Sequence, residues 1–209
     1  MSQSQPQAAI RRKLLAAARL AKPARAATGK TLPRAFHFTD PVRTPDILRV
    51  VRRLPDGFGI VWRHYGLADR LAVGRDLARV CRQRGIMLLV SADPALARRI
   101  GADGVHWPEA RLTGARLPGL IETASAHSAR AIARAAHLGV DAVFVSAIFP
   151  SQSPSAGKPL GPLKFRQLAR AACIPVYALG GINARNAARA TSHAAGWAAV
   201  DAVLDGWGR

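Results

Sequence analysis

The sequence predicts an α/β protein, a compact (β/α)8 TIM barrel that follows a basic N-terminal extension. From residue 35 onward, eight short apolar runs alternate with helix-like stretches at intervals of roughly 20 residues, as βα units do. The runs are continuously apolar, which is typical of parallel strands buried on both faces. No GxGxxG turn follows the first run, so the competing architecture, a doubly wound open sheet, has less support.

The N-terminal extension is expected to cover residues 1–34, with one short helix over 10–20 whose Ile10, Leu14 and Leu15 could dock on the barrel. The barrel is expected to cover residues 35–209. Its strands are predicted at 35–39, 58–62, 86–90, 104–106, 121–125, 142–146, 176–179 and 198–200. Its helices are predicted at 46–54, 67–84, 94–100, 129–138, 163–172 and 184–195, each ending near a glycine or proline.

The charge balance of 31 Lys and Arg against 12 Asp and Glu gives a net charge of +19, which favours anionic ligands. The basic residues are mostly Arg and accompany Ala throughout, so biased composition explains them better than nucleic-acid binding. The acid-free N-terminus is similar to an organellar transit peptide, but a solvated extension is the favoured interpretation. Cys81 and Cys173 lack metal-ligand spacing, and no apolar run approaches the ~20 residues of a membrane span. A cytoplasmic protein is expected.

Polar residues at the predicted strand ends are the candidate site, because the loops after barrel strands carry the chemistry. His127, after the fifth strand, is the candidate general acid or base. Gly180 and Gly181, after the seventh strand, are candidate phosphate-binding residues, since glycines let backbone amides approach an anion. The candidate substrate-binding residues come from strands two and four and from the long loop over 149–161: Arg63, His106, Ser151, Ser153 and Lys158.

In this order, these residues resemble the thiamine phosphate synthase and thiazole tautomerase family. The resemblance rests on FTD at 38–40, GADGVH at 101–106, SAHS at 125–128, IFP at 148–150 with Gly161, and IPVYALGGI at 174–182. It implies a (β/α)8 barrel of thiamine biosynthesis. One branch of the family joins an aminopyrimidine pyrophosphate to a thiazole phosphate with Mg²⁺. The other branch isomerises a thiazole carboxylate phosphate, and His127 aligns with its proton-transferring histidine.

The sequence departs from the synthase pattern where that pattern holds Mg²⁺. Ser91-Ala92 stands for Asn-Asp, with Asp93 one place late, and Arg111 stands for the second carboxylate. Arg63 is kept, but the Gln and Lys that flank it in the pattern are lost, and Asp201 replaces a phosphate-binding Ser. Mg²⁺ normally takes carboxylate and phosphate oxygens. We therefore expect no metal-binding residue unless Asp93 and Glu109 converge with open oxygens.

The resulting hypothesis is a thiazole phosphate-binding barrel with tautomerase-like proton transfer or weak synthase activity. The expected partner is a phosphorylated thiazole or aminopyrimidine. The alternatives are an active synthase with a rearranged metal site and a catalytically retired barrel that binds RNA or another polyanion. The latter requires Arg11, Arg12, Arg52, Arg53, Arg98 and Arg99 to form one stripe. The oligomeric state stays open.

Overall fold

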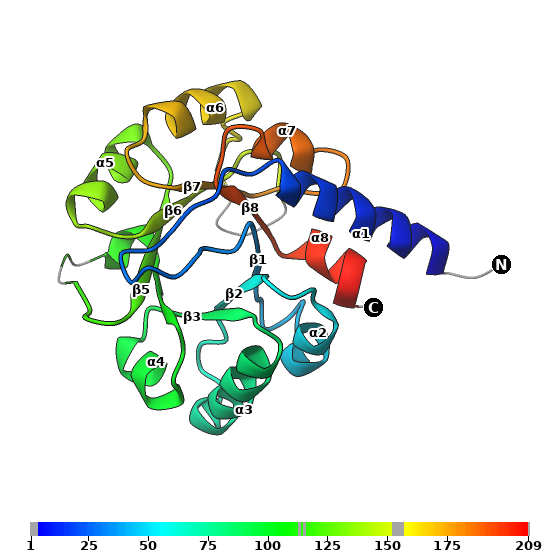
Figure 1. Ribbon diagram of the computed structural model, residues 1–209, viewed down its shortest axis with the longest axis vertical. Helices are drawn as coiled ribbons and strands as arrows, with labels where there is room; N and C mark the ends of the chain where they lie inside the picture. The colour runs from blue at the N-terminus through cyan, green and yellow to red at the C-terminus, as the bar shows by residue number, and fades with distance from the viewer. Residues whose placement is uncertain (1–3, 113, 115, 152–156, 209) are drawn as a thin grey trace.

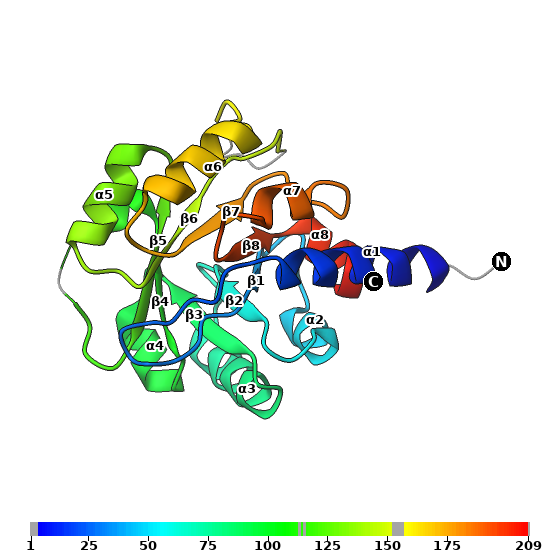
Figure 2. The same ribbon diagram turned by 45° about the horizontal axis from the view of Figure 1, so that its top comes forward.

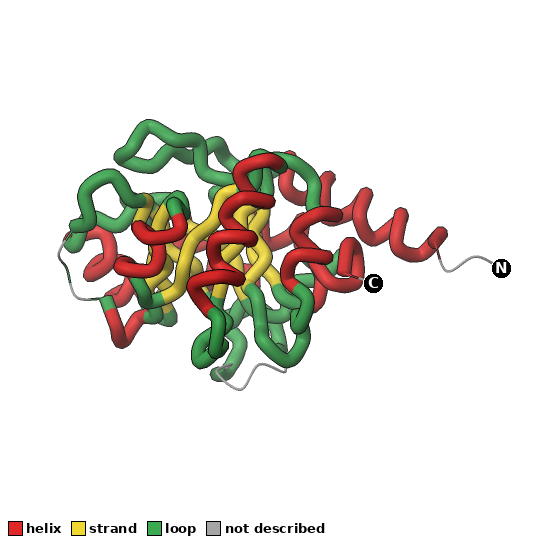
Figure 3. The backbone as a smooth tube through the Cα atoms, turned by 90° about the horizontal axis from the view of Figure 1, so that it is seen from below, coloured by secondary structure: helices red, strands yellow, loops and turns green. Residues whose placement is uncertain are grey.

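Eight parallel strands close into a barrel in chain order, with β8 pairing back to β1. The structure is a computed structural model that describes residues 4–112, 114, 116–151 and 157–208. Helices surround the barrel, and loops cover both of its ends (Figures 1 and 3). The predicted (β/α)8 architecture is therefore confirmed. The strands are β1 (Ala35–Phe38), β2 (Gly59–Trp62), β3 (Met87–Ser91), β4 (Gly104–Trp107), β5 (Ile121–Ala126), β6 (Ala142–Val145), β7 (Val176–Leu179) and β8 (Gly196–Ala199).

The helices follow the predicted positions except at the N-terminus, where α1 begins six residues earlier than predicted, and near the C-terminus. The element α7 begins later than the predicted helix over 184–195, because Asn183 and Asn186 hydrogen-bond the backbone in a turn before it, and it ends earlier, at Thr191. β8 begins two residues earlier than expected. The helices are α1 (Ser4–Arg19), α2 (Ile47–Arg53), α3 (Arg70–Gln83), α4 (Pro94–Ile100), α5 (Ala129–His137), α6 (Pro162–Ala171), α7 (Ala187–Thr191) and α8 (Asp201–Val203), with short turns η1 (Glu109–Arg111) and η2 (Leu204–Gly208).

Aromatic rings fill the inside of the barrel. The ring of Phe144 lies 4.9 Å from those of Phe38 and Tyr177, and Phe36 packs edge-on against Phe144 at 5.1 Å. These side chains are fully or almost fully buried. A second apolar layer lies between the strands and the helices. Apolar side chains thus point both inward and outward along each strand, which explains the continuously apolar runs.

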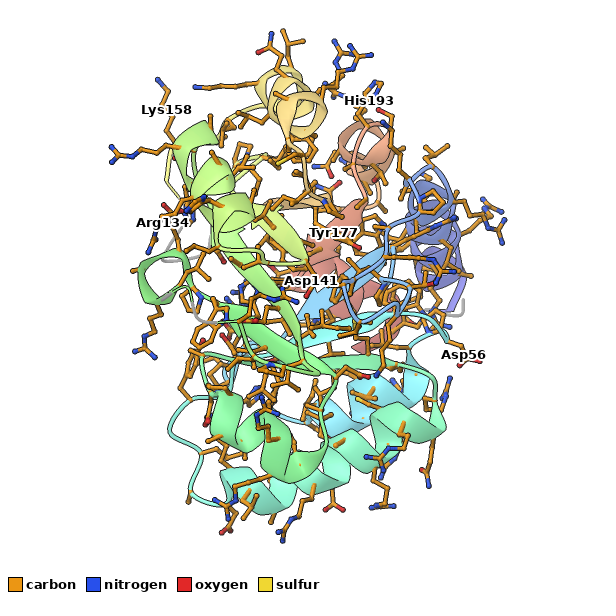
Figure 4. The ribbon with its side chains drawn as sticks, turned by 60° about the vertical axis from the view of Figure 1, so that its left-hand side comes forward. Asp56, Arg134, Asp141, Lys158, Tyr177 and His193 are labelled. Atoms are coloured by element: carbon orange, nitrogen blue, oxygen red, sulfur yellow. The ribbon has the colours of Figure 1, made fainter. Side chains whose placement is uncertain are left out.

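The N-terminal segment closes the end of the barrel where the strands begin. Ala27 N donates to Asp141 Oδ1 at 2.6 Å, Lys30 pairs with Asp103 at 2.6 Å, and the Tyr177 hydroxyl donates to the Pro33 carbonyl at 2.7 Å. In Figure 1 the blue chain after α1 crosses this end, and Figure 4 labels Asp141 and Tyr177 near the centre of the fold. Hydrogen bonds and an ion pair therefore fix this segment over the barrel.

The helix α1 is longer than the sequence indicates and packs on the barrel. It lies beside α7 and the C-terminal turn η2 in both ribbon views (Figures 1 and 2). Leu14 is fully buried, and Ile10 and Leu15 are partly buried against the same core. All three residues expected to dock therefore do so.

The arginines proposed to form a polyanion-binding stripe are divided among α1, α2 and α4. The helix α3 contacts both α2 and α4, and η2 contacts both α1 and α2. Other elements therefore separate the three helices, which weighs against a continuous stripe.

Among the described residues, none of the helices has the length and apolar character of a membrane-crossing one.

Candidate functional site

A cavity of about 250 Å³ opens at the carboxyl ends of the strands. It lies next to β6, β7, β8, β1 and β2, the end at which barrel enzymes carry their chemistry. A larger cavity of about 700 Å³ lies at the opposite end, beneath α1 and the N-terminal segment. The smaller cavity is the candidate site because polar side chains and glycines from the loops after the strands line it. These include Arg43, Arg63, Ser146, Ser151, Gly180, Gly181, Asn183 and Asp201.

The turn after β7 needs both of its glycines. Gly180 has φ +91° and Gly181 has φ +65°, in the left-handed region that side chains rarely adopt. A Cβ on Gly181 would lie 2.3 Å from the Pro150 carbonyl oxygen, and a Cβ on Gly180 would lie 2.8 Å from Ala147 Cα. Within the described part of the chain, neither glycine amide donates a hydrogen bond. The turn thus offers two N–H groups beside the cavity, as an anion site requires.

Two arginines place positive charge around the same cavity. Arg63 donates from Nε to the Thr39 carbonyl at 2.7 Å, and its guanidinium lies 5.4 Å from the centre of the Phe38 ring. Arg43 donates to Asp40 at 3.1 Å and to Asp201 at 3.0 Å. Burial alone would raise the pKa of Asp40, but hydrogen bonds from Arg43 hold it below its ordinary value. The carboxylate of Asp201, expected to repel a phosphate, is therefore paired with a cation.

His127 lies at the end of β5 between a carboxylate and a hydroxyl. Its Nδ1 lies 2.6 Å from Glu109 Oε2, and its backbone N–H donates to the same oxygen at 2.9 Å. Its Nε2 lies 3.1 Å from Ser146 Oγ. Because a carboxylate accepts hydrogen bonds, Glu109 places the proton of the neutral imidazole on Nδ1 and leaves Nε2 as the acceptor. The imidazole is thus oriented as a base.

Ser146 stands between His127 and the cavity. Ser146 lines the cavity, whereas His127 and Glu109 are absent from its wall. The side chain of His127 is 49% exposed at the rim. Among the described residues, the Ser146 hydroxyl is therefore the hydrogen-bonded link from the imidazole to the cavity.

His106 is more deeply placed than a substrate-binding residue would be. Its Nδ1 and Nε2 each lie 3.0 Å from a hydroxyl, those of Thr123 and Ser125, and the residue is 2% exposed. Burial, and then the charge of Arg63, lower the pKa of His106 to about 3. His106 is not among the cavity residues, so the structure assigns it to the barrel interior.

The long loop after β6 contributes only part of what the sequence predicts. Ser151 lines the cavity. Ser153 lies outside the described residues. Lys158 is exposed, and in Figure 4 its side chain extends away from the barrel. Lys158 is therefore not part of this cavity wall in the structure.

The carboxylates of Asp93 and Glu109, close to the positions where the family pattern holds Mg²⁺, do not converge on a metal site. Asp93 Oδ1 accepts from Leu96 N at 2.9 Å, capping α4, and Oδ2 pairs with Arg70 at 2.7 Å. Glu109 is bound to His127 instead. Across residues 4–112, 114, 116–151 and 157–208, no three His, Cys, Asp or Glu side chains form a cluster that could hold a metal ion. Asp93 and Glu109 thus serve other partners.

Sequence reasoning did not assign the roles of Glu109 and Arg43. Glu109 was considered only as a metal ligand, and its position on η1 beside His127 depends on the fold of the loop after β4. Arg43 lies in the loop after β1. The loops after barrel strands converge on one end of the barrel. Charged residues several positions beyond a strand were therefore also candidates for the site.

A family model described as thiamine monophosphate synthase matches residues 49–203. The thiamine-phosphate synthase of Geobacillus kaustophilus is 37% identical over 126 residues, which cover 57% of each protein. That of Thiobacillus denitrificans is 36% identical over 128 residues, which cover 58% of this chain and 61% of the relative. The matched stretch thus spans less than two thirds of these relatives.

Among solved structures, a thiamine phosphate pyrophosphorylase from Pyrococcus furiosus is similar to this chain with a TM-score of 0.69. The similarity covers 84% of this chain and 88% of that protein at 24% sequence identity. This match supports the barrel fold.

Proposed function

Because this chain belongs to the thiamine monophosphate synthase family, we propose that it binds a phosphorylated thiazole-like molecule and transfers a proton on it through His127. One observation carries the proposal: the Gly180–Gly181 turn lines the same cavity as Ser146, whose hydroxyl is hydrogen-bonded to His127. The glycine turn suits a phosphate, and the hydrogen-bonded Ser146 and His127 suit proton transfer.

In this proposal the phosphate binds at the turn after β7. Gly180 and Gly181 donate their backbone N–H groups to it, and Arg63, which lines the same cavity, supplies a positive charge. Arg43 offsets the carboxylate of Asp201. Ser151 adds a hydroxyl to the wall. Ser153, outside the described residues, and Lys158, outside the cavity wall, stay predicted ligands.

His127 takes up a proton from the bound molecule and returns it to another atom of the same molecule. Glu109 stabilises the imidazolium that forms, because its carboxylate accepts from Nδ1. Ser146 Oγ lies between Nε2 and the cavity, so its hydroxyl can pass the proton. This is the chemistry that the tautomerase branch of the resemblance implies.

Synthase activity is the second candidate, favoured by the names of the relatives. It needs Mg²⁺ to shield a leaving pyrophosphate. For Asp93 to serve as a ligand, its carboxylate would have to leave both Arg70 and the α4 N-terminus. We therefore expect synthase activity to be weak.

Two assays separate these functions. Isomerisation of a thiazole carboxylate phosphate should be catalysed by the protein, and His127→Gln should slow it by about 10²–10⁴-fold, the usual share of a general acid or base. His137→Gln, an exposed change on α5, is the matched control and should retain the full rate. Robust thiamine phosphate formation from aminopyrimidine pyrophosphate, thiazole phosphate and Mg²⁺, with no isomerisation, would overturn the proposal in favour of the second candidate.

Two further expectations stay predictions. Binding of RNA by the basic surface has less support, because the arginines it requires come from separated helices. A cytoplasmic location rests on cysteine usage, with Cys81 buried, Cys173 exposed and both free.

A further inference from the structure

Three side chains from successive strand ends form one hydrogen-bonded chain beside the cavity. Glu109 follows β4, His127 follows β5 and Ser146 follows β6. The distances are 2.6 Å from Glu109 Oε2 to His127 Nδ1 and 3.1 Å from His127 Nε2 to Ser146 Oγ. Carboxylate, imidazole and hydroxyl in this order activate a serine for nucleophilic attack. We propose that Ser146 is such a nucleophile and that the protein hydrolyses carboxylic esters of small anionic molecules.

The direction of each hydrogen bond agrees with this role. Glu109 accepts from Nδ1, so Nε2 of the neutral imidazole accepts in turn, and the Ser146 hydroxyl donates to it. The Glu109 carboxylate is held in place by the His127 backbone N–H. The turn that carries Glu109 is held by Arg134, which donates to the Leu112 carbonyl at 2.7 Å and to the Glu109 carbonyl at 3.4 Å. The order of the chain is thus fixed by several contacts.

The surroundings of Ser146 supply the other requirement of acyl transfer, donors for a developing oxyanion. Gly180 and Gly181 line the same cavity as Ser146, and their amides donate to no other described residue. The built Cβ position of Gly180 lies 2.8 Å from Cα of Ala147, the residue after Ser146, so the two loops are immediate neighbours. Arg63, which lines the same cavity, favours an ester that also carries a negative charge.

The reaction balances without a metal or a redox partner. Ser146 Oγ attacks the ester carbonyl carbon while its proton passes to His127 Nε2. The carbon–oxygen bond to the alcohol then breaks, and the alcohol oxygen takes the proton from Nε2. Water attacks the acyl group on Ser146, releases a carboxylic acid and restores the hydroxyl. This activity differs from the proton transfer proposed above because a covalent acyl-serine forms.

The test is labelling of the full-length protein with a fluorophosphonate, read by intact mass and peptide mapping. We expect one adduct on Ser146, no adduct in Ser146→Ala, and labelling about 10²–10⁴-fold slower in His127→Gln. Ser192→Ala and His137→Gln are matched controls, because both side chains are exposed and lie outside the cavity wall. They should label at the wild-type rate.

Hydrolysis of p-nitrophenyl acetate gives the second readout. Glu109 acts as a positioning residue, so Glu109→Gln should lower kcat with little change in KM and without changing the circular dichroism spectrum.

Absence of a Ser146 adduct in the wild-type protein would overturn the proposal, and so would labelling that His127→Gln leaves unchanged. Neither readout uses a thiazole. Failure of isomerisation therefore leaves the labelling prediction standing, and failure of labelling leaves the proposed function standing.

Discussion

Lowering the pH from about 7.5 to about 5 should destabilise the barrel through two buried imidazoles, His37 and His106. Burial is the largest cause that lowers the pKa of each from 6.5 to about 3, and nearby arginines lower both further. His106 lies among the rings of Phe38 and Phe144, at 5.1 Å and 5.4 Å, where a positive charge would lose its hydration.

The sign and size follow from proton binding in the two states. Because the folded pKa is the lower one, the unfolded chain binds more protons between about pH 6.5 and pH 3, so stability falls as the pH drops through that window. At about pH 5 an unfolded imidazole is almost fully protonated and the folded one is neutral. This difference in proton binding lowers the unfolding free energy by about 2 kcal/mol per histidine.

Urea unfolding at the two pH values measures this loss. His106→Gln keeps groups that can bond to Thr123 and Ser125 but cannot titrate, so its loss on acidification should be smaller than that of the wild type by about 2 kcal/mol. The contributions of the other titrating groups cancel in the comparison, because both proteins contain them; these groups include His37, His64 and Asp40. An equal loss in the two proteins would refute the assignment of His106 as a buried neutral group.

Three other changes test the packing, the glycine turn and the thiols. Leu14→Ala should lower the unfolding free energy by about 2–5 kcal/mol in urea titrations, because Leu14 is fully buried; a loss below about 1 kcal/mol would show that α1 does not dock. Gly181→Ala should weaken thiazole phosphate binding at least about tenfold in calorimetry, since its Cβ would displace the Pro150 carbonyl; unchanged affinity would remove the turn from the site. A thiol reagent should modify exposed Cys173 in the native protein and reach buried Cys81 only on unfolding, because burial, and then Asp103, raise the pKa of Cys81 to about 12. Equal modification rates of the two cysteines in the native protein would contradict the burial of Cys81.

The strands were predictable because one physical requirement governs them all. A strand that faces both the barrel interior and the helix layer must be apolar on both sides, and Gly or Pro marks many of the ends. The helix over 184–195 was overextended because its apolar spacing continues through a turn. The side-chain bonds of Asn183 and Asn186 form that turn, and periodicity does not register them.

The candidate site was predictable to the level of strand ends. His127, Gly180 and Gly181 follow strands directly, so topology alone places them at one end. The partners of those residues depend on how loops fold against each other. The turn η1 brings Glu109 into hydrogen-bond contact with His127, and Asp93 forms an ion pair with Arg70 of the preceding βα unit. Spacing in the chain predicts neither contact.

Calorimetric titration of the protein with thiazole phosphate, with and without Mg²⁺, addresses the central question most directly. The cavity offers the two glycine N–H groups of the turn after β7. The positions where the family pattern holds Mg²⁺ carry Ala92 and Arg111, and the neighbouring carboxylates of Asp93 and Glu109 have other partners. We therefore expect binding with the same affinity in both titrations. Binding that requires Mg²⁺, or that tightens about tenfold or more when it is added, would contradict the account.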